Sequence, residues 1–239
     1  MREADVWIFD MDGTVLDTIT DLTASLNFAL RSTGYRGEFP EETVKAFFGS
    51  GAAVAVTRAL AMEAGTDFSA LETVGTAEDT VSAGIDPEEV KRVLAVFKPH
   101  YEAHCGDHTA AYAGIPGVLR QLRERGKKTA VVSNKPDPAV QELARDLFPG
   151  MFDFVLGEKA GMPRKPAPDM VLAAMEALGG SRETSVCVGD SEIDLQTAEN
   201  AGIPCICVLW GFRTKEFLVR RGAEILAASA EEIPDAGLI

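Results

Sequence analysis

The chain lacks several patterns that would place it in an export or membrane class. Its four cysteines, Cys105, Cys187, Cys205 and Cys207, form no C-x-x-C pair, so we expect reduced core thiols rather than disulfides or a thiol metal site. The N-terminus has no charged-then-apolar signal pattern, and no stretch approaches the roughly 18 apolar residues of a membrane span. We therefore expect a soluble, cytoplasmic protein that does not act at a membrane.

Basic residues are also scarce. Lys and Arg number 23 against 37 Asp and Glu, which gives a net charge of −14. This balance argues against a nucleic-acid or anionic-membrane partner, since both favour a basic face. A small anionic substrate stays possible, because a few local cations or a metal ion can reverse the field inside a site.

The apolar segments that are present alternate with helical ones. Short strand-like runs occupy residues 6–10, 129–133, 152–156, 185–190 and 205–209, with a weaker sixth at 224–228. Helical spacing occupies residues 116–125, 138–147, 169–178 and 192–200. Strands that are apolar throughout indicate a sheet covered on both faces. The fold class we expect is α/β, with a doubly wound, mostly parallel, Rossmann-like sheet.

One long interval breaks this alternation. Between residues 17 and 105 we find no strand, only helical segments at 19–32, 41–48, 52–64, 70–83 and 87–104. We expect a core domain of residues 1–16 and 106–239, with a helical cap domain of residues 17–105 inserted after the first strand. The linkers near 14–18 and 106–114 are candidate hinges, and the insert can close over the adjoining sheet edge as a lid.

Chemistry-bearing residues follow the first strand directly, in the run Asp10-Met11-Asp12-Gly13-Thr14. The carboxyl ends of strands in an open α/β sheet form the edge where ligands bind. Two carboxylates close together repel each other unless a cation or a shared proton offsets the charge. The run therefore suggests a metal site, a nucleophile paired with an acid, or both.

Three further polar groups lie at or near later strand ends. They are Ser133-Asn134-Lys135, Lys165 within Arg-Lys-Pro-Ala-Pro-Asp, and Gly189-Asp190-Ser191-Glu192-Ile193-Asp194. Carboxylates are hard oxygen ligands that suit Mg²⁺, while hydroxyl, amide and lysine groups stabilise an oxyanion. Together these residue types indicate phosphoryl transfer to an aspartate, followed by hydrolysis of the acyl phosphate.

These four motifs, in this order, resemble those of the haloacid dehalogenase-like phosphohydrolases. Phe48-Gly49-Ser50-Gly51 in the insert and Trp210-Gly211-Phe212-Arg213 after the last core strand look like the phosphoglycolate phosphatase-like branch. The resemblance implies a strand order of 3-2-1-4-5, which makes strands 1 and 4 neighbours. It also implies Mg²⁺-dependent hydrolysis of a phosphomonoester, with 2-phosphoglycolate as the expected substrate.

The resemblance also implies a role for each matching residue. Asp10 is the nucleophile and a metal ligand; Asp12 is the general acid and base, and its backbone carbonyl is a metal ligand. Asp190 ligates the metal, and Asp194 is a second ligand or an outer-shell orienter. Lys165 balances negative charge. The residues expected to bind phosphate or substrate are Gly13, Thr14, Ser133, Asn134 and Lys165, with Gly49, Ser50 and Gly51 in the cap.

Several alternatives stay open at this point. The substrate could instead be a sugar phosphate, a nucleotide or pyrophosphate, and a β-phosphoglucomutase-type phosphotransferase retains the same motifs. Asp12 argues against a dehalogenase, whose leaving halide needs no proton. A receiver domain carries its acidic pair and its phosphoacceptor on different strands, unlike this chain. We expect a monomer or homodimer that binds a small phosphorylated metabolite.

Overall fold

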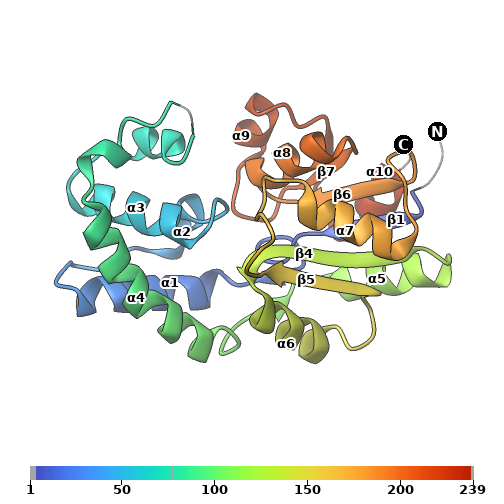
Figure 1. Ribbon diagram of the computed structural model, residues 1–239, viewed down its shortest axis with the longest axis horizontal. Coiled ribbons are helices and arrows are strands. Elements are labelled where there is room, and N and C mark those ends of the chain that lie inside the picture. Colours follow the sequence, from blue (N-terminus) through green and yellow to red (C-terminus); the bar gives the residue numbers. More distant parts are fainter. Residues whose placement is uncertain (1–3, 77, 238–239) are drawn as a thin grey trace. The chain divides into compact units, whose positions relative to one another are not determined.

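A computed structural model of the chain describes residues 4–76 and 78–237 (Figure 1). The described residues divide into two compact units. One unit runs up to Asp17 and resumes at Ala110, and the other is Thr18–Thr109. The first is an α/β unit and the second is helical.

The α/β unit is built on six strands whose pairings are all parallel. The order across the sheet is β5-β4-β1-β6-β7-β8. The strands are β1 (Val6–Phe9), β4 (Lys128–Pro136), β5 (Phe154–Glu158), β6 (Ser185–Gly189), β7 (Cys205–Val208) and β8 (Ile225–Ala227). The expected α/β class is confirmed, and so is the neighbouring position of the first and fourth predicted strands, here β1 and β6.

Both faces of this sheet are buried under helices, because apolar side chains of its central strands point to both faces. The side chains of Trp7 and Phe9 lie in one core cluster and those of Val6 and Ile8 in another, as the two-residue period of a strand requires. The first cluster packs against α5 (Ile115–Glu124), α6 (Asp137–Leu147) and α10 (Ile233–Ala236). The second packs against α7 (Asp169–Leu178), α8 (Glu192–Ala201) and α9 (Lys215–Arg220).

A two-stranded antiparallel ribbon was not expected from the sequence. It pairs β2 (Leu16–Asp17) with β3 (Ala110–Ala111), next to the boundary between the units. Two residues per strand are too few for a recognisable alternation pattern. The ribbon therefore ties together, within the α/β unit, the two chain segments that enter and leave the helical unit.

The helical unit contains four α-helices and two short 3₁₀ turns among its described residues. The helices are α1 (Ile19–Ser32), α2 (Glu41–Phe47), α3 (Ala52–Glu63) and α4 (Pro87–His104), and the 3₁₀ turns are Phe68–Thr73 and Ser82–Gly84. α4 starts where Asp86 accepts a hydrogen bond from the Glu88 backbone, with Pro87 in the first turn, a favourable start for a helix. α1 packs along α4, which also contacts α3.

The helix predicted over residues 70–83 is wrong. Gly75 has a φ of +87°, a left-handed conformation that interrupts a helix. The Asp79 carboxylate accepts hydrogen bonds from the backbone N–H groups of Gly75, Val81 and Ser82. These local bonds compete with helical ones, so the described part of this segment forms turns.

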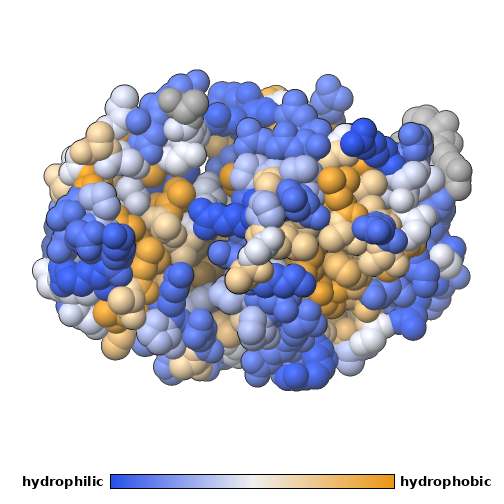
Figure 2. Space-filling view, viewed as in Figure 1, coloured by the Kyte–Doolittle hydropathy of each residue, from blue (hydrophilic) through white to orange (hydrophobic). Residues whose placement is uncertain are grey.

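The surface is rich in hydrophilic residues, as expected of a chain in which 25% of the residues are charged. Figure 2 shows hydrophilic side chains over most of the face it presents, with smaller hydrophobic patches between them. Within residues 4–76 and 78–237, no helix combines the length and the apolar character that a bilayer crossing requires.

Candidate active site

Three carboxylates meet at the carboxyl edge of the central strands. Phe9, the last residue of β1, pairs in register with Val188 of β6, so Asp10 and Asp190 follow neighbouring strand ends. Asp194 joins them from the first turn of α8. One carboxylate oxygen from each lies within 4.8 Å of the others, and no other group of three or more potential metal ligands was found in the described parts of the chain.

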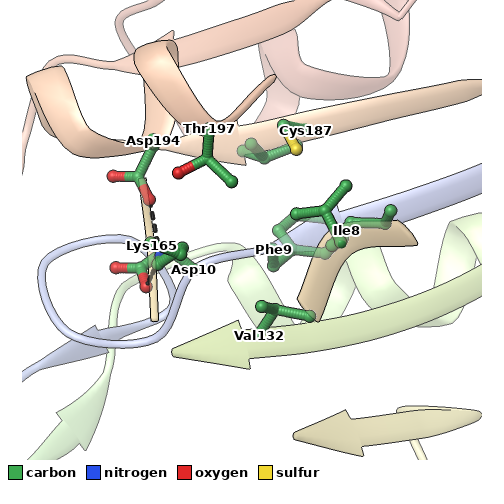
Figure 3. A pocket seen from close by; sticks show the side chains of 10 residues that line it. Ile8, Phe9, Asp10, Val132, Lys165, Cys187, Asp194 and Thr197 are labelled. Carbon is green, nitrogen blue, oxygen red and sulfur yellow. Dashed lines mark hydrogen bonds and ion pairs between the residues drawn. The ribbon is translucent and has the colours of Figure 1, made fainter. Parts of the chain in front are cut away.

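Lys165 is the cation of this cluster. Its buried Nζ lies 2.5 Å from Asp10 Oδ1 and 2.7 Å from Asp194 Oδ1. Figure 3 shows these groups together at one side of a small pocket, with Ile8, Val132 and Cys187 on its apolar side. Burial alone would lower the pKa of Lys165, but the carboxylates of Asp10 and Asp194 raise it above its usual value. The lysine is therefore a fixed positive charge.

The loop that carries Lys165 is held by Asn134. This residue lies near the end of β4, the strand that pairs with β1 on the side opposite β6. The Asn134 side-chain amide donates to the backbone oxygen of Lys165 at 2.9 Å, and its side-chain oxygen accepts from the backbone N–H of Lys165 at 2.8 Å. The amide of Asn134 thus contacts Lys165 rather than another side chain. Its expected contact with phosphate stays a prediction.

Asp194 has donors on both carboxylate oxygens. Oδ1 accepts from Lys165, while Oδ2 accepts from the backbone N–H and the hydroxyl of Ser191, at 3.1 and 2.7 Å. This is a capping box that starts α8. Both expected roles of Asp194, as a direct metal ligand and as an orienter, stay predictions.

Asp190 is clamped from two loops. Its Oδ1 accepts from the Thr14 hydroxyl at 3.0 Å and its Oδ2 from the Phe212 backbone N–H at 2.7 Å. A Cβ atom on Gly13 or on Gly211 would collide with the Asp190 side chain. Both loops therefore need glycine where they approach this carboxylate.

Burial and like charge disfavour ionisation of this cluster. Burial and the charge of Asp194 together raise the pKa of Asp190 to about 7, against the opposing bonds from Phe212 and Thr14. Burial, Asp194 and Asp190 raise the pKa of Asp10 well above its usual value, although Lys165 opposes them. Three ionised carboxylates against one ammonium leave two negative charges, which one hard divalent cation such as Mg²⁺ would balance. The donor set thus fits such a cation.

A second ion pair lies beside this cluster. Lys135 Nζ is 2.9 Å from Asp12 Oδ1, and the lysine side chain is 2% exposed. The Lys135 backbone N–H donates to the Ser133 hydroxyl at 3.2 Å. Lys135 was absent from the expected site residues. The available signal was its position directly after Ser133-Asn134 at a strand end.

Sequence reasoning noted the segment after β7 only as a resemblance and gave its residues no role at the site. The Trp210 indole Nε1 donates to the Thr14 backbone oxygen at 3.1 Å, and Phe212 holds Asp190 through its backbone. Arg213 forms a two-point ion pair with Glu192 at the start of α8. The segment therefore holds polar groups of the site.

The three expected cap residues lie in the helical unit, between α2 and α3. Gly49 and Gly51 have φ values of +103° and +93°, which only glycine adopts without strain. Gly51 immediately precedes α3, and Ser50 lies between the two glycines. Their contact with substrate stays a prediction.

The parallel sheet, the inserted helical unit and the buried acid–lysine cluster define an α/β enzyme built to handle a phosphate group. The sequence model of the haloacid dehalogenase-like hydrolase family matches residues 7–208 of the chain. The chain belongs to this family as one of its phosphatases, in the phosphoglycolate phosphatase-like branch.

Named proteins of similar sequence align with most of the chain. The phosphoglycolate phosphatase of Pseudomonas putida is 33% identical over 207 residues, which cover 86% of this chain and 69% of that protein. The phosphoglycolate phosphatase of Shigella boydii is 30% identical, over 96% of this chain and 91% of its own length. A crystal structure from Lactobacillus delbrueckii subsp. bulgaricus, a provisionally assigned phosphoglycolate phosphatase, superposes with a TM-score of 0.96 at 50% identity and 99% coverage of both chains.

Proposed function

We propose that this phosphatase hydrolyses 2-phosphoglycolate to glycolate and phosphate with Mg²⁺, through a phosphoryl group carried by Asp10. The observation that carries the proposal is the position of Asp10, held by Lys165 and grouped with Asp190 and Asp194 at the carboxyl edge of the sheet. The substrate rests on the names of the relatives.

The residues that would hold Mg²⁺ are Asp10, Asp190 and the backbone carbonyl of Asp12, with Asp194 touching the ion or orienting Lys165. When bound, the ion supplies positive charge that offsets the phosphate oxygens and the carboxylates. Lys165 supplies a further charge that lets the anionic nucleophile approach an anionic phosphate.

The neighbouring polar groups would hold the phosphoryl group. Ser133 offers a hydroxyl. Gly13 and Thr14 lie on the tight loop after β1, where their backbone N–H groups donate to the Leu16 and Met11 carbonyls, and their contact with phosphate stays a prediction. Asn134 contributes by fixing the Lys165 backbone. Asp12, two residues beyond the nucleophile, gives a proton to the leaving oxygen and later takes one from the attacking water.

The helical unit would act as the cap that selects the leaving group and excludes water. Gly49, Ser50 and Gly51 are our candidates for contact with the glycolate part of the substrate. Cys187, Cys205 and Cys207 are buried thiols, which supports a reducing compartment such as the cytoplasm.

The test is phosphate release from a panel of phosphorylated metabolites, with Mg²⁺ and with EDTA. We expect kcat/KM for 2-phosphoglycolate to exceed that for sugar phosphates, nucleotides and pyrophosphate by at least about tenfold, the discrimination that shape-selective contacts readily supply. A higher value for another metabolite would replace the substrate. Bisphosphate-dependent isomerisation of a sugar phosphate would instead indicate a phosphotransferase.

A further inference from the structure

The ion pair between Lys135 and Asp12 has no role in the chemistry described so far. Lys135 comes from β4 and Asp12 from the loop after β1, 123 positions apart in the sequence. The Lys135 side chain is 2% exposed and that of Asp12 is 20% exposed. Ordering and burying a lysine is costly unless its ammonium is well paired, so this contact is a built feature of the site.

An irregularity in β4 brings Lys135 to this position. Val132 pairs with Leu156 of β5, and the next pair is Pro136 with Glu158, so the register shifts between them. The shifted residues are Ser133, Asn134 and Lys135. Such a bulge re-aims side chains that would alternate in a regular strand. Here Asn134 contacts the Lys165 backbone and Lys135 contacts Asp12.

The chemistry of the ammonium group limits how Asp12 can carry a proton. A lysine ammonium has three donors and no acceptor. The Asp12 oxygen that it contacts, Oδ1, must therefore act as an acceptor whether the carboxyl group is ionised or protonated. A proton on Asp12 is then confined to Oδ2.

We propose that Lys135 is the positioning residue for Asp12: it holds Oδ1 and makes Oδ2 the oxygen that exchanges protons with the leaving group and the water. The inference rests on the proposed function, because it assumes that Asp12 is the general acid and base. Lys165 then contacts the nucleophile Asp10, and Lys135 contacts the general acid Asp12.

Both half-reactions balance with this assignment. In the first, an Asp10 oxygen forms a bond to phosphorus, the bond from phosphorus to the leaving oxygen breaks, and that oxygen takes the proton of Asp12 Oδ2. In the second, a water oxygen forms a bond to phosphorus and Asp12 Oδ2 takes a water proton. The bond from phosphorus to the Asp10 oxygen breaks, which restores the Asp10 carboxylate. The sum is ester plus water to alcohol plus phosphate, and Lys135 keeps its proton throughout.

The test compares Lys135→Met with the wild type on monoesters whose leaving groups differ in basicity. Glycerol phosphate has a poor leaving group that needs a proton, whereas p-nitrophenyl phosphate has a good one. Misplacing a catalytic group by about 1 Å costs on the order of 100-fold. We expect kcat/KM to fall about 100-fold for the alkyl ester and less than about tenfold for p-nitrophenyl phosphate.

Two further variants separate positioning from a purely structural role. In an Asp12→Asn background, Lys135→Met should change kcat by less than about threefold, because two residues that act as one unit are not additive. Lys135→Arg keeps a donor at this position and should restore part of the alkyl-ester activity. Lys128→Met is the matched control, since Lys128 is an exposed lysine at the other end of β4 and its loss should not alter the leaving-group dependence.

Equal losses on both esters, or a full additional loss in the Asp12→Asn background, would overturn this inference and assign Lys135 to phosphate binding or folding. If Lys135→Met does not fold, the same comparison is made with Lys135→Arg and Lys135→Gln. The generic esters keep this result separate from the identity of the natural substrate. Turnover retained by Asp10→Asn would instead remove the proposed function itself.

Discussion

The indole of Trp210 donates a hydrogen bond to the backbone carbonyl of Thr14, with 3.1 Å between Nε1 and the oxygen. Thr14 in turn donates its hydroxyl to Asp190 Oδ1. The segment after β7 thereby fixes the loop after β1, and this loop fixes a carboxylate that follows β6. Three strand ends are locked together around the proposed metal ligand.

Trp210→Phe should weaken Mg²⁺ binding while leaving the maximal rate largely intact. The variant keeps an aromatic ring but loses the N–H donor, so the Thr14 loop holds Asp190 less firmly. One hydrogen bond contributes about 1 kcal/mol, so we expect the half-saturating Mg²⁺ concentration to rise about three- to tenfold. The measurement is activity against Mg²⁺ concentration at saturating substrate.

The chain offers a matched control in its other tryptophan. Trp7 donates its indole N–H to the Ala4 backbone oxygen and lies fully buried in the core. Trp7→Phe should lower thermal stability without shifting the Mg²⁺ titration. A shift of equal size in both variants would contradict a specific role for Trp210.

Asp10→Asn should abolish turnover and leave the fold intact. An amide oxygen cannot form the acyl phosphate, so kcat should fall by more than about 10⁴-fold. The substitution also relieves repulsion from Asp190 and Asp194, which contribute to the raised pKa of Asp10, while Lys165 keeps its bond to Asp194. We expect the unfolding temperature to change by less than about 4 °C, or about 1 kcal/mol.

Phosphate release and thermal unfolding of Asp10→Asn, measured beside the wild type, decide the point. A folded Asp10→Asn protein with more than about 1% of wild-type turnover would show that another group attacks phosphorus.

Much of the α/β unit follows from local sequence. The central strands of the sheet are rich in apolar, β-branched residues, and helices such as α7 end at glycines in the left-handed conformation. The alternation of strands and helices can therefore be predicted from the sequence alone. The proximity of Asp10 to Asp190 also follows, once β1 and β6 are neighbours. These features depend on short-range patterns and on one topological rule.

Other features depend on contacts that no local pattern encodes. The bond from Lys135 to Asp12 and the bond from Trp210 to Thr14 span 123 and 196 positions. The helix expected over residues 70–83 fails because Asp79 captures nearby backbone N–H groups, which is a competition between local bonds that composition does not decide. The strands of the β2–β3 ribbon are too short to show the two-residue alternation of apolar and polar side chains that identifies a strand in sequence.

Asp21→Asn should destabilise the helical unit. Asp21 is buried in the first turn of α1 and accepts hydrogen bonds from the backbone N–H groups of His108 and Thr109 and from the Thr109 hydroxyl. It therefore fastens the end of the helical unit to its beginning. We expect a loss of about 2–3 kcal/mol at pH 7, as for hydrogen bonds to a buried charged group.

The pH dependence of this loss is a second readout. Burial pushes the pKa of Asp21 upward, but the bonds from His108 and Thr109 outweigh it and lower the pKa. A lowered carboxyl pKa stabilises the fold above its unfolded value and loses that effect as the pH falls. Chemical denaturation should therefore show the difference from wild type shrinking below about pH 4, while the exposed control Asp146→Asn stays within about 0.5 kcal/mol throughout.

Metal affinity should rise with pH across the neutral range. Burial and the neighbouring Asp194 raise the pKa of Asp190 to about 7, so a proton occupies this carboxylate below pH 7 and competes with the cation. Mg²⁺ affinity should increase from pH 5.5 to 8 by up to about tenfold per pH unit for each proton displaced, and level off above. Isothermal titration calorimetry at pH 6.5, in buffers of different ionisation enthalpy, should show release of a proton on binding.

The metal-free protein supplies the complementary measurement. A raised carboxyl pKa favours the fold at low pH and loses that effect as the pH rises through the folded-state value. Metal-free wild type should therefore lose stability relative to Asp190→Asn between about pH 4 and 7, because only the wild type must ionise this buried carboxylate. Affinity that does not change over this range, together with parallel stability curves, would mean that Asp190 is already ionised without the cation and that the clamp from Thr14 and Phe212 outweighs its burial.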